Sequence, residues 1–243
     1  VALAKMGAKV GLMDADVYGP NIPMMMGVDA IEKVEEVGEG KVLIHPAKSY
    51  DVKIMSIGFM VQPEQAIIWR GPMLHSAIQQ FLNDVQWGEL DYLVIDLPPG
   101  TGDVQLSLAQ SSSLTAGVIV TLPQMVSVDD ARRGLEMFKT LEINVLGVIE
   151  NMSFLTLPNG ETMDVFGMGG GEVLAETVDV PFLGNIPMDP NVRIGGDTGK
   201  PIVISDPEND VSKAIVEIAE KVALQTSLNN LTAPAPKISI SMG

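Results

Sequence analysis

With 243 residues, of which 46% are apolar and 5% aromatic, the chain is long enough for one α/β domain with a core of Val, Ile, Leu and Met. Its formal net charge of −16 disfavours binding to nucleic-acid backbones and anionic membranes, because both would be repelled. The chain has no cysteine, which excludes cysteine chemistry here, and it has no membrane-spanning run or signal peptide, so we expect a cytoplasmic protein.

Short apolar runs alternate with longer amphipathic segments along most of the chain. We predict strands at Lys9–Met13, Val52–Ser56, Tyr92–Asp96, Ala116–Thr121, Val145–Glu150 and Pro181–Ile186. We predict helices at Pro72–Val85, Val104–Gln110, Val128–Leu141, Gly171–Thr177 and Val211–Gln225. This alternation predicts βαβ crossovers and an α/β fold, a doubly wound, mostly parallel sheet with helices on both faces.

Two segments interrupt this rhythm. Residues 27–50 predict a short two-stranded excursion from the main sheet. Residues 227–243 lack helical periodicity and contain two Ala-Pro pairs, which favours a flexible tail. We therefore predict a single domain over residues 1–226, followed by a tail at 227–243.

Acidic residues follow two of the predicted strands. Asp14 and Asp16 come at the end of the first strand, and Asp96 ends the third. In an open parallel sheet, ligands bind outside the carboxyl ends of the strands. A carboxylate in that position is costly unless hydrogen bonds or a cation meet it. Magnesium bound through water fits, because it prefers oxygen ligands and retains part of its hydration.

The segment after Asp96 reads LPPGTGD, with Gly100 and Gly102 two residues apart. Glycines allow a backbone to approach a phosphate and to direct N–H groups at it. A strand that ends in an Asx-type turn is the alternative, and it explains one such strand end as well as phosphate binding does. The repetition of acids at two strand ends favours the phosphate interpretation.

An ordered set of motifs resembles the Mrp/ApbC branch of the MinD/ParA-type P-loop ATPases, whose members carry iron–sulfur clusters. The motifs are DADVYGPNIP (14–23), IIWRGPM (67–73), LDYLVIDLPPGTGD (90–103), TLPQ (121–124), GVIENMS (147–153), FGMGGGE (166–172) and LGNIPMDPNVR (183–193). They cover nearly the whole chain, and the resemblance implies ATP and Mg²⁺ as cofactors.

The resemblance also implies roles for individual residues. Asp16 matches the acid that orients the attacking water, and Asp96 matches the carboxylate behind magnesium, with Asp14 beside them. Gly100, Gly102 and Asp103 belong to a match with the second switch loop.

At the other end of the expected nucleotide, Asn151 matches the residue that hydrogen-bonds adenine, and Pro187 lies where the family packs against the base. An amide suits adenine because it offers a donor and an acceptor side by side. A cap or turn residue after a strand is the alternative for Asn151.

The phosphate-binding loop of the family, G-x-x-x-x-G-K-[ST], is absent. The nearest stretch, GGDTGKP at 195–201, has Pro201 in place of the hydroxyl residue. Because VALAKMGAKV at 1–10 reads as the end of a helix, we expect a P-loop NTPase fold that lacks its first strand and P-loop. We therefore expect this fragment to bind and hydrolyse ATP poorly.

The cysteine pair that holds a bridging 4Fe–4S cluster in many relatives is absent as well. Leu157 and Gly160 stand at the two cysteine positions, so no cluster ligand is present in this chain. The Gly169-Gly170-Gly171 run that follows is typical either of an anion site at a helix start or of a flexible entry turn.

The leading hypothesis is an ATP-hydrolysing iron–sulfur cluster carrier or scaffold that works as a homodimer and delivers clusters to apo iron–sulfur proteins. It needs no nucleic acid and no membrane. A spatial regulator of the MinD/ParA kind is an alternative, although the acidic balance of the chain disfavours DNA or lipid contacts. A nucleotide-free pseudo-ATPase that acts as an interaction protein is the other.

Overall fold

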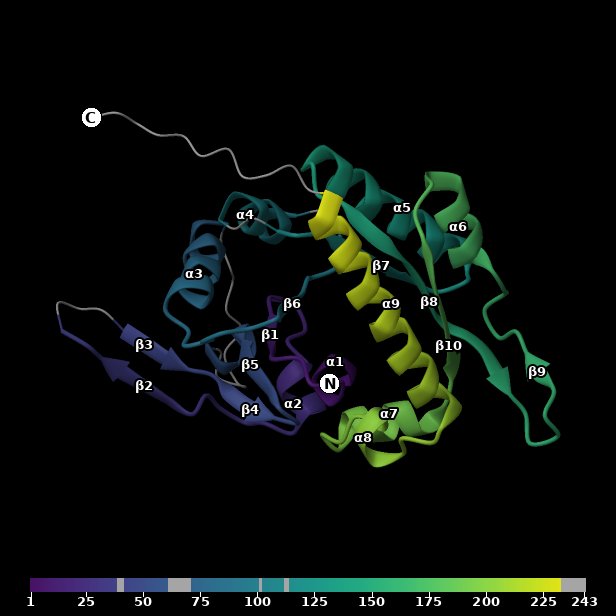
Figure 1. The fold of residues 1–243 in the computed structure, drawn as a ribbon, viewed down its shortest axis with the longest axis horizontal. Helices are drawn as coiled ribbons and strands as arrows, with labels where there is room; N and C mark the ends of the chain where they lie inside the picture. Colours follow the sequence, from purple (N-terminus) through teal and green to yellow (C-terminus); the bar gives the residue numbers. More distant parts are fainter. Residues whose placement is uncertain (39–41, 61–70, 101, 112–113, 233–243) are drawn as a thin grey trace.

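A computed structural model describes residues 1–38, 42–60, 71–100, 102–111 and 114–232, and Figure 1 shows its arrangement. The first sheet has the strand order β4-β5-β1-β6. Its strands are β1 (Val10–Asp14), β4 (Ala47–Ser49), β5 (Val52–Ser56) and β6 (Tyr92–Asp96). β5 and β6 pair with the two sides of β1 in parallel, and β4 adds an antiparallel edge.

The second sheet has the order β10-β8-β7. Its strands, β7 (Gly117–Thr121), β8 (Val145–Thr156) and β10 (Phe182–Met188), are parallel, and the short β9 (Thr162–Met163) returns against the end of β8. β2 (Lys33–Glu36) and β3 (Val42–His45) form a separate antiparallel ribbon, which is the two-stranded excursion expected within residues 27–50.

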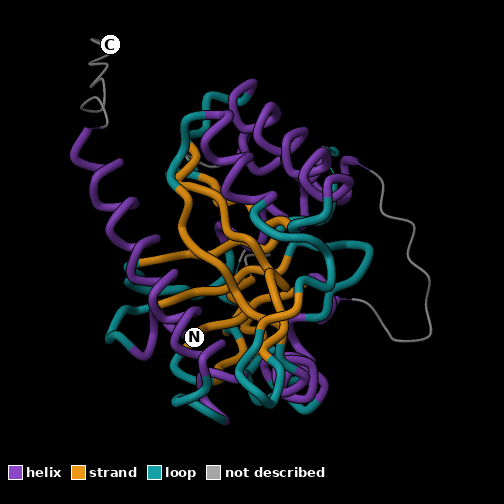
Figure 2. Tube along the Cα trace, turned by 90° about the vertical axis from the view of Figure 1, so that its right-hand side faces the viewer, coloured by secondary structure: helices purple, strands orange, loops and turns teal. Residues whose placement is uncertain are grey.

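Helices surround these strands, as Figure 2 shows. They are α1 (Ala2–Lys5), α2 (Ile22–Met26), α3 (Gly71–Asn83), α4 (Asp103–Ser111), α5 (Met125–Thr140), α6 (Gly170–Val178), α7 (Pro190–Asp197), α8 (Ile202–Ser205) and α9 (Asp210–Thr232), with a 3₁₀ turn at Ile57–Met60. The mixed α/β class with a mostly parallel sheet, predicted from the alternation of segments, is confirmed. Among the described residues, no helix combines the length and hydropathy that a membrane crossing requires.

Each sheet has its own apolar core. Met13, Phe81 and Leu108 are almost fully buried where α3 and α4 cover the first sheet. Leu135 and Leu174 are buried where α5 and α6 cover the second. On α3 the buried residues recur at helical spacing, so this helix presents one apolar face to the sheet; they are Leu74, Ala77, Ile78 and Phe81.

One expectation needs correction. The helix predicted to end at Gln225 continues through Thr232, six residues into the expected tail, because leucines at helical spacing continue its pattern. Residues 233–243 lie outside the described residues. The strands form two sheets, because β6 and β7 are not paired with each other.

Candidate functional site

The structure brings the three predicted acids together at one edge of the first sheet. Asp14 and Asp96 are the last residues of β1 and β6, and they are register partners on these neighbouring strands. The Ala15 amide donates to the Asp96 carbonyl at 2.9 Å, which extends the pairing by one residue. Asp16 follows in the same loop. The prediction that these carboxylates lie close together, made because parallel strands end at a common edge, is therefore confirmed.

Asp14 is fully buried. Its Oδ2 accepts a hydrogen bond from Ser56 Oγ at 2.8 Å, and its Oδ1 accepts one from the Asp16 amide at 3.1 Å. Burial raises the pKa of Asp14, and these hydrogen bonds offset part of that rise. Ser56 was not among the predicted site residues, although it is the polar last residue of β5, and a polar residue at a strand end is the signal that identified Asp96.

Asp16 is half-buried and closes the turn that follows β1. Its Oδ1 accepts hydrogen bonds from the Tyr18 amide at 2.9 Å and the Gly19 amide at 3.2 Å. This is an Asx-type turn, the alternative that the sequence left open for the strand ends, and it fixes the orientation of the carboxylate. Turn formation and a role toward a ligand are compatible, because these two bonds engage only one oxygen.

Asp96, the last residue of β6, is solvent-exposed. Partial burial, followed by repulsion from Asp14 and Asp16, raises the pKa of Asp96 to about 6. A cation near this carboxyl would lower its pKa again, because a positive charge favours the ionised form. No group of three or more acidic or histidine side chains among the described residues converges to enclose a metal directly. The acids therefore fit magnesium held through water, not a fully protein-ligated ion.

The loop after β6 is held by Gln105, which the sequence analysis did not identify. Gln105 is buried on α4; its Nε2 donates to the carbonyls of Pro98 at 2.9 Å and Gly100 at 3.1 Å. Its Oε1 accepts from the Gly102 amide at 2.9 Å, so this amide is already engaged. Gly100 has a φ of 92°, which only glycine adopts without strain. Asp103 begins α4, and Thr101 lies outside the described residues.

The two residues expected at the base end lie on the second sheet. Asn151 on β8 is the register partner of Ile186 on β10, and the register shifts at the next position, where Pro187 stands. Proline has no N–H to donate to the hydrogen-bond ladder of a sheet, so a bulge is a position where a strand tolerates it. Asn151 lies within β8, because that strand continues to Thr156 instead of ending at Glu150 as predicted. The acids and the Asn151–Pro187 pair are therefore on different sheets.

The triple-glycine run has a ligand within the chain itself. Glu150 is fully buried, and its carboxylate accepts hydrogen bonds from Ser153 Oγ, from the Gly169 amide at 3.3 Å and from the Gly171 amide at 2.7 Å. The last two come from the start of α6, whose helix dipole favours an anion there. Of the two alternatives for this run, the anion site is the one observed, and Glu150 occupies it.

The segment at the family's cysteine positions is a closed hairpin turn between β8 and β9. The Leu157 amide donates to the Glu161 carbonyl at 2.8 Å, and the Gly160 amide donates to the Leu157 carbonyl at 2.9 Å. Asn159 Oδ1 accepts from the Glu161 amide at 3.1 Å. Neither Leu157 nor Gly160 offers a metal ligand, so this turn does not fit a cluster.

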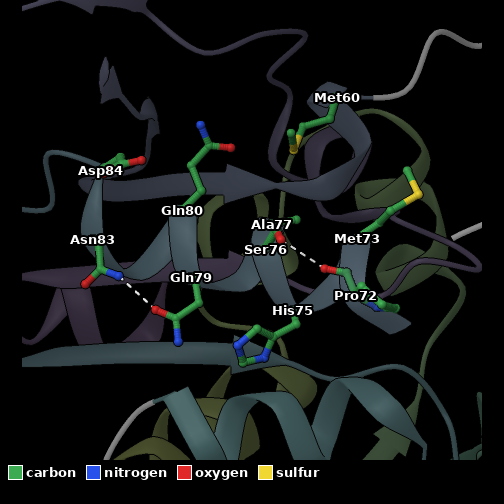
Figure 3. Close-up of a pocket in the computed structure, with 10 residues that line it drawn as sticks. All are labelled: Met60, Pro72, Met73, His75, Ser76, Ala77, Gln79, Gln80, Asn83 and Asp84. Atoms are coloured by element: carbon green, nitrogen blue, oxygen red, sulfur yellow. Dashed lines mark hydrogen bonds between the residues drawn. The ribbon is translucent and has the colours of Figure 1, made fainter. Parts of the chain in front are cut away.

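An open cavity of about 850 Å³ lies on α3, between Met60 and Asp84 (Figure 3). It is lined by Met60 and by residues of α3 that include Met73, His75, Gln79, Gln80 and Asn83, and it contains none of the predicted site residues. The cavity is therefore not the candidate site. The acids at the edge of the first sheet define that site.

Comparisons with known proteins agree on one family. A family model described as the NUBPL iron-transfer P-loop NTPase, of ParA type, matches residues 1–223. A relative from Synechocystis sp. named iron-sulfur cluster carrier protein is 50% identical over 231 residues, which cover 94% of this chain and 65% of the relative. One of the same name from Pyrococcus horikoshii is 45% identical over 229 residues, covering 91% of this chain and 77% of the relative. The chain thus spans just under two thirds of the Synechocystis relative.

Solved structures support the same fold. A nucleotide-binding protein in complex with ADP from Archaeoglobus fulgidus is 33% identical, with a TM-score of 0.68, covering 86% of this chain and 79% of its own. The septum site-determining protein MinD with Mg-ADP from Pyrococcus horikoshii is 23% identical, with a TM-score of 0.67, covering 94% of this chain and 88% of its own. The MinD likeness concerns the fold alone.

Proposed function

The chain belongs to the NUBPL iron-transfer P-loop NTPase family of ParA type, and we propose that its full-length protein is an ATP-hydrolysing iron–sulfur cluster carrier. In this proposal it works as a homodimer and passes clusters to apo iron–sulfur proteins. The relatives named iron-sulfur cluster carrier protein support the carrier role. ATP hydrolysis and the site residues are proposed from the geometry of the acids at the sheet edge.

The pairing of Asp14 with Asp96 at the carboxyl edge of the first sheet carries the proposal. Asp96 would hold magnesium through water, and bound magnesium would neutralise phosphate charge during transfer. Asp16 would orient the attacking water through the oxygen that its turn bonds leave available. Asp14, held by Ser56, would fix the position of that loop. Positioning and electrostatics supply most of the catalysis in phosphoryl transfer, so a rigid arrangement of acids suits this chemistry.

The base would lie at the second sheet. Asn151 on β8 would recognise adenine through its amide, and Pro187 on β10 would pack against the ring. In this arrangement the nucleotide spans from the first sheet, where its phosphates meet the acids, to the second.

The cluster is cargo in this proposal, and the hairpin turn from Leu157 to Glu161 does not supply ligands for it. A cluster carried by the full-length protein would therefore be held by other groups. A nucleotide-free interaction protein remains the second candidate. The lack of both a G-x-x-x-x-G-K-[ST] loop and a cysteine in these 243 residues favours it.

Calorimetric titration with ATP and Mg²⁺ tests the proposal. We expect weak or no binding by the 243-residue chain and micromolar binding by the full-length protein. In the latter, Asp96→Asn should abolish the magnesium dependence, whereas Asp129→Asn, an exposed carboxylate on α5, should leave it unchanged. Full-length protein that binds no nucleotide would support the interaction protein instead.

A further inference from the structure

A cavity of about 510 Å³ lies between α2, the 3₁₀ turn at Ile57–Met60 and the C-terminal end of α7. Figure 1 shows α2 beside α7 in the lower part of the view. The end of α7 belongs to GGDTGKP (195–201), the stretch that does not fit a phosphate-binding loop. Asp197, Thr198 and Gly199 of this stretch form one wall of the cavity instead.

Two glycines hold this wall against α2. Gly27 ends α2 with a φ of 64°, and Gly199 has a φ of 67°. A Cβ atom on Gly199 would lie 2.5 Å from Gly27 Cα, and one on Gly27 would lie 2.9 Å from the Gly199 carbonyl oxygen. The Tyr50 hydroxyl donates to that carbonyl at 2.7 Å. This close backbone contact fixes the wall, so the cavity is preformed and a ligand binds it with little rearrangement of the chain.

The lining combines apolar side chains with carboxylates. The apolar residues are Pro20, Pro23, Met24, Val28 and Phe59. Met24 is 53% exposed, so its flexible thioether is available to pack against a ligand. Such a surface suits the methylene stem of a long side chain.

The charged residues of the lining are both acids, Asp29 and Asp197, and no basic side chain is among its described residues. Asp29 is exposed and forms no ion pair or side-chain hydrogen bond within the described part of the chain. Asp197 pairs with Arg193 at 2.6 Å, an exposed pair that contributes little to stability. A cation at Asp29 therefore meets an uncompensated carboxylate, and the net charge of −16 attracts it from a distance.

We propose that this cavity, which we call the α2–α7 pocket, binds an arginine side chain in an extended basic segment of a partner protein. The arginine stem packs on the prolines and Met24, and the guanidinium pairs with Asp29. Arginine suits the pocket better than lysine, because a guanidinium is weakly hydrated and stacks on aromatic rings such as Phe59. A second copy of this chain is disfavoured, because two molecules of charge −16 repel each other.

The pocket adjoins the candidate site, and in this step the inference rests on the proposed function. The amide of its wall residue Gly58 donates to Ser56 Oγ at 2.9 Å, and Ser56 donates to Asp14. Pro20, which also lines the pocket, comes directly after the turn that Asp16 closes. A docked segment therefore contacts both parts of the chain that hold these acids. Docking and nucleotide binding should thus change each other's affinity by the same factor.

Titration of a peptide into the isotope-labelled 243-residue chain tests the pocket. The probe is acetyl-Gly-Leu-Arg-Leu-Gly-amide, and the control peptide has citrulline in place of arginine, which keeps the shape and removes the charge. The NMR amide signals of Gly27, Gly58 and Gly199 report on the pocket, and that of Gly134 on α5 reports on the surface elsewhere. We expect the probe to shift the pocket signals alone, and the citrulline peptide to bind about tenfold more weakly or less.

Two matched pairs of variants locate the binding. Asp29→Asn should weaken the probe about tenfold, whereas Asp129→Asn on α5 makes the same change in net charge and should leave the affinity unchanged. Met24→Gln should weaken the probe about threefold, and Met125→Gln, at a 66% exposed position outside the pocket, should not. All four positions are exposed, so these variants should fold.

Three results would overturn the proposal. Equal losses in Asp29→Asn and Asp129→Asn would show that the peptide is attracted by the net charge and not by the pocket. Equal binding of the arginine and citrulline peptides would show that the guanidinium is not recognised. Shifts of the pocket signals that increase with protein concentration in the absence of peptide would assign the pocket to a second copy of the chain.

Titration of ATP and Mg²⁺ into the full-length protein, with and without saturating probe, separates the pocket from the proposed function. We expect the probe to change the affinity for nucleotide by about threefold or more. An unchanged affinity would overturn the connection between the pocket and the acids. Full-length protein that binds no nucleotide would contradict the proposed ATPase, while the peptide titrations of the 243-residue chain would still decide the pocket.

Discussion

Replacing Glu150 by alanine tests how the part of β8 that carries Asn151 is fixed. The Glu150 carboxylate is fully buried and accepts hydrogen bonds from Ser153 and from the amides of Gly169 and Gly171. It thereby connects β8, one residue before Asn151, to the first turn of α6. Alanine leaves these donors without their acceptor and creates a cavity beside them.

The magnitude follows from these contacts. A buried donor left unsatisfied costs about 1–3 kcal/mol, and loss of one partner of a buried charged network costs about 3–5 kcal/mol. We therefore expect Glu150→Ala to lower the free energy of unfolding by about 3–4 kcal/mol, which corresponds to about 10 °C in Tm for a chain of this length. Glu150→Gln keeps the shape and two of the three acceptor contacts, so it should cost about 1–2 kcal/mol.

Urea unfolding followed by circular dichroism measures these changes. Glu176→Ala, at an exposed position on the same helix, is the control and should change stability by no more than about 0.5 kcal/mol. A loss below about 1 kcal/mol in Glu150→Ala would show that water or a local rearrangement replaces the carboxylate, and the anchoring role would be wrong.

Three further predictions concern the two halves of the site. The pKa of Asp96 is raised to about 6 by burial and then by Asp14 and Asp16, above about 3.9 in the unfolded chain; its contribution to stability is therefore complete below about pH 4 and is lost as the pH rises through 6. Asp96→Asn should thus gain stability relative to the wild type between pH 4 and pH 7, and parallel pH profiles of the urea midpoints would contradict this. Gln105→Ala should release the Gly102 amide and lower the free energy of unfolding by about 1 kcal/mol, and unchanged exchange of that amide would refute the role of Gln105 in the loop. In the full-length protein, Asn151→Ala should weaken ATP about three- to tenfold with little change for GTP, and equal losses in titrations of both nucleotides would exclude adenine recognition.

The first sheet could be predicted closely because its strands are short apolar runs with polar ends. The predicted limits of Val52–Ser56 and Tyr92–Asp96 are those observed. The proximity of Asp14 to Asp96 also followed from the sequence, because parallel strands end at a common edge. Here the local pattern and one rule of sheet geometry were sufficient.

Other contacts depend on residues that are far apart in sequence. The partners of Glu150 at the start of α6 lie 19 and 21 residues further along the chain, and no local pattern predicts them. The extension of β8 to Thr156 had a signal that we did not use. Asn159-Gly160, which lies between β8 and β9, is a strong hairpin dipeptide. The prediction of a missing first strand did not foresee where the two sheets would separate.

Two energetically unfavourable features of this fold lie on the same strand, β6. Asp96 is held near two other acids at the end of β6, and among the described residues the other edge of this strand has no strand partner. Each feature opposes stability, because like charges repel and unpaired strand edges lose hydrogen bonds. Unfavourable local choices that coincide are expected at functional sites, where a ligand or a further segment compensates for them.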